Sequence, residues 1–215
     1  MLLFVGVDDV ENNDDDDDIN IDGDIDGDGF DDLIAGARGV YAYESPVFTL
    51  HGDTNANLTS LPGVSSGALA VTSLDGDNGF RVEGHTSGQS GDVNRATAVA
   101  TGNINGDSVD YLLIGNTWQG FRQPYDTGNA FRVVGESDPS GLHNSHLGSI
   151  ASIYQFFGGT DSRFGAAVAM GDIDNDGMDD LIFGAPGNGF GFIPGNSGPA
   201  GKVYVVYGSS LAAAA

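Results

Sequence analysis

The 215-residue sequence predicts an all-β protein made of repeated units. Three acidic segments align without a gap, and they begin at Gly23, Gly102 and Gly171. Each is followed by an aromatic and β-branched run bounded by glycine, which is typical of a strand. Apolar residues never recur at helical spacing over three turns, and the 35 glycines disfavour long helices. Strands joined by acidic loops are therefore the expected structure.

The third unit shows the expected order of strands most clearly. We predict strands at 164–170, 180–183 and 202–207, with the acidic loop between the first two. Four-stranded antiparallel units repeated around an axis describe a β-propeller. We therefore expect about three β-propeller blades. Because a closed propeller typically needs about four to eight blades, we expect them to belong to a larger or assembled propeller.

The repeats divide the chain into three units with a tail at each end. We also expect strands at 39–43 and 79–84, and long variable loops at 44–73, 117–127 and 187–200. The expected segments are an acidic tail at 1–18, an incomplete first unit at 19–73, a second unit at 74–137, a third unit at 138–210 and a short tail at 211–215.

The composition limits the partners and the chemistry. With 7 basic against 31 acidic residues the net charge is −24, so the chain cannot neutralise phosphates and is not a nucleic-acid binder. The acids are Asp except for Glu11, Glu44, Glu83 and Glu136, and Asp favours loops that offer hard oxygen ligands. Cysteine is absent, which excludes disulfides and thiolate zinc sites. No apolar run is long enough to span a membrane.

Two of the acidic loops carry the ligand spacing of a calcium site. Side chains at positions 1, 3, 5 and 9 and the carbonyl at position 7 converge, as in the first part of an EF-hand loop, although the Glu at position 12 is missing. This oxygen set favours Ca²⁺ over Mg²⁺, which demands a stricter octahedron. The predicted ligands are Asp24, Asp26, Asp28, Phe30 (carbonyl) and Asp32 in the first loop, and Asp172, Asp174, Asp176, Met178 (carbonyl) and Asp180 in the third.

The second loop is a weaker candidate for a metal site. Asn103, Asn105 and Asp107 hold positions 1, 3 and 5, Ser108 replaces the glycine at position 6, and Tyr111 replaces the acid at position 9. One formal negative charge stands where the other loops have four, which weakens calcium binding. The alternative is a loop held by its own hydrogen bonds.

The third unit resembles the FG-GAP repeat of integrin alpha-chain propellers and their bacterial relatives. The resemblance rests on Phe164-Gly165, the acidic loop from Asp172 to Asp180, and Gly184-Ala185-Pro186. It extends with departures over most of 19–208: the first unit lacks the leading Phe-Gly, and the second has Arg95-Ala96 there. The resemblance implies a calcium-stabilised, non-catalytic module for adhesion. It would lie outside the cell or at its surface and bind protein or glycan through the variable loops.

Two other functions remain open from the sequence. FG-GAP repeats accompany catalytic domains, so the chain could be the accessory propeller of a secreted hydrolase or lyase. Unpaired edges of the end blades could instead serve a self-assembling surface-layer or fibre protein. The chain itself offers no paired general acid and base and no G-x-S-x-G elbow, so we do not expect an enzyme. An export signal is not visible, since 1–7 lacks a basic region.

Overall fold

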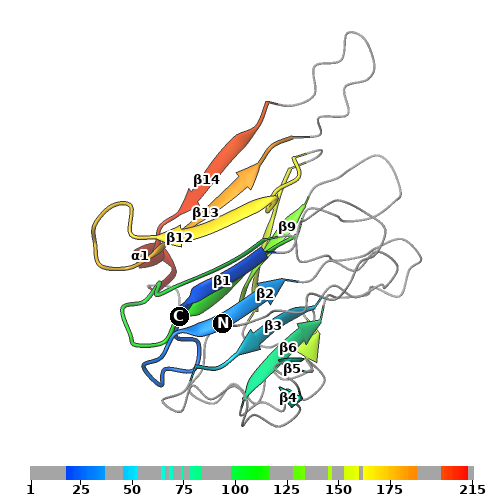
Figure 1. Ribbon diagram of the computed structural model, residues 1–215. Helices are drawn as coiled ribbons and strands as arrows, with labels where there is room; N and C mark the ends of the chain where they lie inside the picture. Colours follow the sequence, from blue (N-terminus) through cyan, green and yellow to red (C-terminus); the bar gives the residue numbers. More distant parts are fainter. Residues whose placement is uncertain are drawn as a thin grey trace, which may run out of the picture.

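A computed structural model gives the fold, and it confirms the predicted class: the chain is nearly all β (Figure 1). Strands form three main antiparallel sheets, as expected for propeller blades. The structure describes residues 18–36, 46–52, 64–65, 68–69, 74, 78–83, 98–116, 128–133, 145–146, 153–159, 162–187 and 200–212.

Each main sheet is one blade, and its strands are short and rich in β-branched and aromatic residues. Blade 1 contains β1 (Asp18–Gly23), β2 (Asp32–Gly36), β3 (Val47–Leu50) and β6 (Gly79–Glu83), with the two-residue β10 (Ser145–His146) parallel to β6. Blade 2 contains β7 (Ala98–Gly102), β8 (Tyr111–Asn116), β9 (Asn129–Val133) and β11 (Ile153–Phe157). Blade 3 contains β12 (Ala167–Gly171), β13 (Asp180–Ala185) and β14 (Lys202–Val206), followed by the short helix α1 (Gly208–Ala212). The remaining pair is β4 (Val64–Ser65) with β5 (Ala68–Leu69).

Blades 2 and 3 share one strand register, so their residues can be compared position by position. Tyr111 pairs with Gly102 as Asp180 pairs with Gly171. In the next pair of strands, Leu112 faces Val133 as Leu181 faces Val206.

The hydrophobic core lies between the blades rather than within one sheet. Alternating residues of a strand point to opposite faces, so the middle strand of blade 2 packs against both neighbours. Leu112 and Ile114 join a buried cluster with Ile34 and Phe80 of blade 1. Leu113, which lies between them in the sequence, is fully buried and belongs to a second cluster that includes residues of blade 3. Stacked blades therefore hold each other in place.

The blades divide the chain differently from the expected units. The strand at Gly79–Glu83 pairs with β3 and closes blade 1, and Ile153–Phe157 pairs with β9 and closes blade 2. The fourth strand of a blade follows a long connection, so sequence signatures alone attach it to the next unit. The expected loop at 44–73 also contains a strand, Val47–Leu50, in the sheet of blade 1.

Other expectations fall on residues outside the described part. These are the acidic tail up to residue 17, the strand at 39–43, the loop at 117–127 and most of the loop at 187–200. Within the described part, no helix is long and apolar enough to cross a membrane.

Candidate metal centres

The three acidic loops lie at the same end of the blades, at the left of Figure 1. This follows from the topology, because each loop joins the first and second strands of its blade. Glycine at position 6 adopts a left-handed backbone in the first and third loops, with φ of 90° at Gly29 and 89° at Gly177. Ser108 holds this position in the second loop, and it is not among the described non-glycine residues with positive φ. The second loop therefore has a different backbone at position 6.

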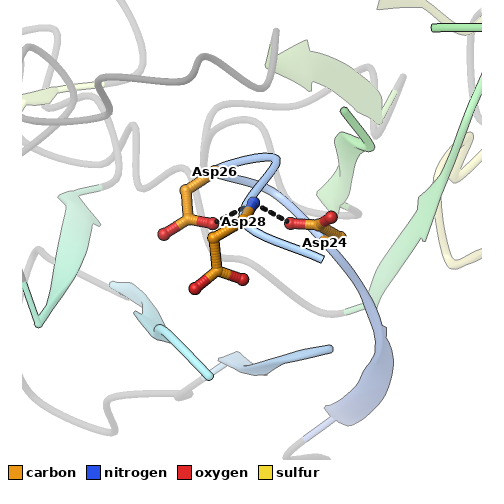
Figure 2. Close-up of side chains that lie close together, drawn as sticks. All are labelled: Asp24, Asp26 and Asp28. Atoms are coloured by element: carbon orange, nitrogen blue, oxygen red, sulfur yellow. Dashed lines mark hydrogen bonds between the residues drawn. The ribbon is translucent and has the colours of Figure 1, made fainter. Parts of the chain in front are cut away.

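The first loop gathers three carboxylates around its own backbone. Figure 2 shows Asp24, Asp26 and Asp28 converging, and one carboxylate oxygen of each lies within 4.8 Å of the others. The Asp28 N–H donates to Asp24 Oδ1 and to Asp26 Oδ1, both at 3.0 Å. The second oxygen of Asp24 accepts from the Gly29 N–H at 2.9 Å. These bonds fix the carboxylates in one orientation before any ligand arrives.

The third loop repeats this arrangement with different neighbours. Asp172 accepts from the Asp176 N–H at 3.0 Å and from the Gly177 N–H at 2.9 Å. Asp172, Asp174 and Asp176 also hold carboxylate oxygens within 4.8 Å of one another, and all three are exposed. The two loops, which share one acidic pattern, therefore build one geometry.

The residues at position 7, whose carbonyls are predicted ligands, join the loops through their backbone N–H groups. Their N–H groups donate to the aspartate two positions earlier, at 2.8 Å for Phe30 and 2.9 Å for Met178. Such Asx-type bonds curl the chain around the loop centre. Within the described part of the chain, neither the Phe30 nor the Met178 carbonyl accepts a hydrogen bond.

The acids at position 9, Asp32 and Asp180, are fully buried and do not belong to the carboxylate clusters. Each instead anchors the loop to its own blade through two backbone N–H groups. The donors are Ile25 (2.9 Å) and Gly52 (2.8 Å) for Asp32, and Ile173 (3.1 Å) and Gly208 (3.0 Å) for Asp180. The sequence pattern assigned these acids only as ligands. The missed signal is the glycine two residues after the third strand, present at both Gly52 and Gly208.

Three aspartates of the first and third loops have pKa values above the ordinary range, because they are desolvated or lie near other negative charges. Desolvation raises the pKa of Asp174, and the negative charges of Asp176 and Asp180 raise it further. Burial likewise raises the pKa of Asp26, and it raises the pKa of Asp32 to about 6. Like charges held together favour protonation unless a positive partner is present.

His51, which the sequence does not connect with any site, lies beside the first loop. His51 follows β3, and its Nδ1 lies 3.4 Å from Asp26 Oδ2. Its ring also meets Phe80 edge-on, with centroids 5.8 Å apart. The pairing of β3 with β2 brings His51 to the loop, a contact that only the register of the sheet reveals.

The second loop ties itself together with amide groups. Asn105 Nδ2 donates to Asp107 Oδ2 at 2.6 Å and to the Tyr111 hydroxyl at 3.1 Å. Asn103 Nδ2 donates to the Asp107 carbonyl, and Asn103 Oδ1 accepts from the Gly106 N–H at 2.7 Å. Amide N–H groups thus occupy the loop centre, where the other loops present only oxygen. Of the described residues, only the first and third loops gather three acidic ligands.

The residue at position 8 clamps each later loop to the loop before it. The Asp110 N–H donates to the Asp24 carbonyl at 2.8 Å, and its carboxylate accepts from the Asp24 N–H at 3.0 Å. Asp179 makes the same pair of bonds with Asn103, at 2.7 and 2.8 Å. One two-bond clamp therefore recurs at both blade interfaces.

The blades share hydrophobic cores, and each carries an acidic loop between its first two strands. These features are those of a β-propeller-like module. Comparison with protein families identifies the repeat: residues 164–206 match the FG-GAP repeat. This match spans blade 3 from Phe164 to the end of β14 and confirms the resemblance of the third unit. No curated protein matches the chain.

Proposed function

We propose that the chain is a calcium-binding, non-catalytic β-propeller module that acts outside the cell or at its surface and binds a protein or glycan. The main support for calcium binding is that the first and third loops have the same geometry. In both loops backbone N–H groups orient three carboxylates whose oxygens lie within 4.8 Å of one another.

The donor set suits a hard divalent cation. Every candidate ligand is a carboxylate or carbonyl oxygen, and Ca²⁺ accepts six to eight such oxygens at flexible geometry. In the first loop Asp24, Asp26 and Asp28 would hold the ion with the Phe30 carbonyl, and Asp32, which lies outside their cluster, would anchor the loop to its blade. Asp172, Asp174, Asp176, Met178 and Asp180 take the same roles in the third loop. The FG-GAP match covers this third loop and supports the assignment.

Calcium would act as a structural element of the blade. The position-9 acids connect each loop to Gly52 or Gly208, which follow the third strand of the same blade. An ion that orders the loop therefore also orders the end of that blade. Because three like charges repel in the empty loop, binding contributes free energy to folding.

The topology separates the metal loops from the proposed recognition loops. The chain at 117–127 and 188–199 joins the second and third strands of blades 2 and 3, so it leaves from the end opposite the acidic loops. The chain after β3 leaves from the metal end, where His51 contacts Asp26. We therefore propose that the loops after the second strands bind the ligand and that 51–73 does not take part.

The composition supports an extracellular setting. Extracellular modules bind calcium at about 10⁻⁴ to 10⁻³ M, a range that suits a setting where calcium is abundant. A chain without cysteine has no disulfides, and calcium bound in two loops would stiffen it instead. The carboxylates accept backbone N–H bonds in turns, an arrangement that holds a cation rather than one that moves a proton.

Thermal unfolding in calcium and in excess chelator tests the calcium proposal. We expect calcium to raise Tm, magnesium to raise it much less, and chelator to increase proteolysis within 23–32 and 171–180. The double variant Asp24→Ala/Asp172→Ala should lose the calcium response. The matched control Asp107→Ala, in the second loop, should keep it. A melting curve that is the same in calcium and in chelator would exclude structural calcium sites.

A further inference from the structure

The side chain that follows the third strand differs between the two blades with acidic metal loops. His51 follows β3 and Tyr207 follows β14, and each precedes the glycine whose N–H donates to the buried acid of its loop. The two residues therefore occupy equivalent positions. The His51 side chain is 5% exposed, and its Nδ1 lies 3.4 Å from Asp26 Oδ2. Tyr207 is 48% exposed.

Contacts with the sheet fix the place of the His51 ring. The His51 N–H donates to the Asn78 carbonyl at 3.2 Å, and the N–H of the next residue, Gly52, donates to Asp32 at 2.8 Å. The imidazole meets the fully buried Phe80 edge-on, with ring centroids 5.8 Å apart. Because Phe80 belongs to β6 and His51 follows β3, the pairing of these two strands sets the position of the ring.

His51 and the loop backbone restrain different oxygens of Asp26. The Asp28 N–H donates to Asp26 Oδ1 at 3.0 Å, while His51 Nδ1 faces Asp26 Oδ2. A carboxylate only accepts hydrogen bonds, so it favours the imidazole form that carries a hydrogen on Nδ1. His51 does not belong to the group of ligand atoms that Asp24, Asp26 and Asp28 bring together. It therefore acts on the loop centre through Asp26 and not as a ligand.

The equivalent aspartate of the third loop has different surroundings. Asp174 holds the position of Asp26, and among the described residues the charged groups that act on it are all acidic: Asp172, Asp176 and Asp180. The two loops thus share their acids and their backbone bonds, and they differ in the support behind the acid at position 3.

We propose that His51 is a positioning residue that holds Asp26 for calcium, so that the first site binds calcium more tightly than the third. This inference rests on the calcium binding proposed above. A carboxylate that is already oriented loses less freedom when it binds a metal. Groups that hydrogen-bond to a metal ligand from its outer side typically contribute about 10-fold to 100-fold in metal affinity.

Calcium titration calorimetry of each site alone tests this proposal. Asp172→Ala leaves the first site and Asp24→Ala leaves the third, and we expect the first to have the lower Kd. In the Asp172→Ala background, His51→Leu keeps apolar bulk against Phe80 but removes the N–H. It should raise Kd by about 10-fold or more. His51→Asn, whose side-chain N–H is as many bonds from the backbone as Nδ1, should restore most of the affinity.

The matched control is the equivalent position in blade 3. Tyr207→Leu in the Asp24→Ala background should leave the Kd of the third site unchanged. Thermal unfolding of every variant in chelator checks the fold without bound calcium. A purely structural role for His51 would lower Tm equally in calcium and in chelator and would leave Kd unchanged.

Three results would overturn the role of His51. The first is an unchanged Kd in His51→Leu, and the second is a loss of affinity that His51→Asn does not restore. The third is tighter binding in His51→Leu, which would show that His51 competes with the cation. Any of these with calcium still bound would leave the proposed calcium sites intact. Absence of calcium binding from both single-site proteins and from the wild type would overturn both proposals.

Discussion

The first and third loops differ from the second in what fills the loop centre. In the first and third loops, oxygens of three carboxylates lie close together, and backbone N–H groups donate to them. In the second, the side-chain N–H groups of Asn103 and Asn105 supply the positive partner themselves. One strand-loop-strand scaffold thus supports both a loop centred on carboxylate oxygens and a loop whose centre holds side-chain amide groups.

The comparison also separates the loop residues that connect blades from those that connect a loop to its own blade. The clamp at position 8 recurs whether the partner is Asp24 or Asn103, so it belongs to the stacking of blades. The buried acid at position 9 occurs only in the first and third loops, where it holds the glycine after the third strand. Tyr111 takes that position in the second loop and bonds to Asn105 instead.

Removing the buried acid of the third loop should have the largest effect. Asp180→Ala leaves the N–H groups of Ile173 and Gly208 without their acceptor, and buried unsatisfied groups of this kind cost about 3 kcal/mol in unfolding free energy. Urea unfolding of the variant and of the wild type measures this loss of unfolding free energy. Both are unfolded in chelator, so that bound metal does not contribute. A loss below about 1 kcal/mol would mean that Asp180 is only a ligand.

Converting the second loop into the first should add a calcium response. Asn103→Asp/Asn105→Asp/Ser108→Gly restores three acids and the glycine at position 6. We expect lower stability than wild type in chelator, because the amide bonds are lost, and a further calcium stabilisation of about 2.7 kcal/mol at a hundredfold excess over Kd. Ser108→Gly alone is the control and should add no calcium response. An unchanged calcium response in the triple variant would contradict the claim that the amide side chains keep the second loop from binding calcium.

Removing one hydroxyl should have the smallest effect. Tyr111→Phe deletes the 3.1 Å bond from Asn105 and keeps the ring that lies 5.1 Å from the Arg132 guanidinium. We expect a loss of about 0.5 to 1 kcal/mol in unfolding free energy, the same in calcium and in chelator. A loss seen only in chelator would indicate that the second loop also binds calcium.

The sequence predicted the fold class and the acidic loops between the first and second strands of each blade, because these depend on local spacing. It misplaced the fourth strands, since β6 and β11 join their sheets only after long connections. It could not find the His51 contact with Asp26 or the clamp of Asp179 on Asn103 either. Both arise from pairing and stacking between segments that are distant in the chain.

The number of calcium ions bound per chain tests the central claim most directly. Equilibrium dialysis of the wild type against calcium should give two ions per chain, falling to one in Asp24→Ala and in Asp172→Ala, and staying at two in Asp107→Ala. Two ions that are lost in this pattern would establish the oxygen-only loops as the sites. No bound calcium, or a third ion that Asp107→Ala removes, would contradict the distinction between the loops.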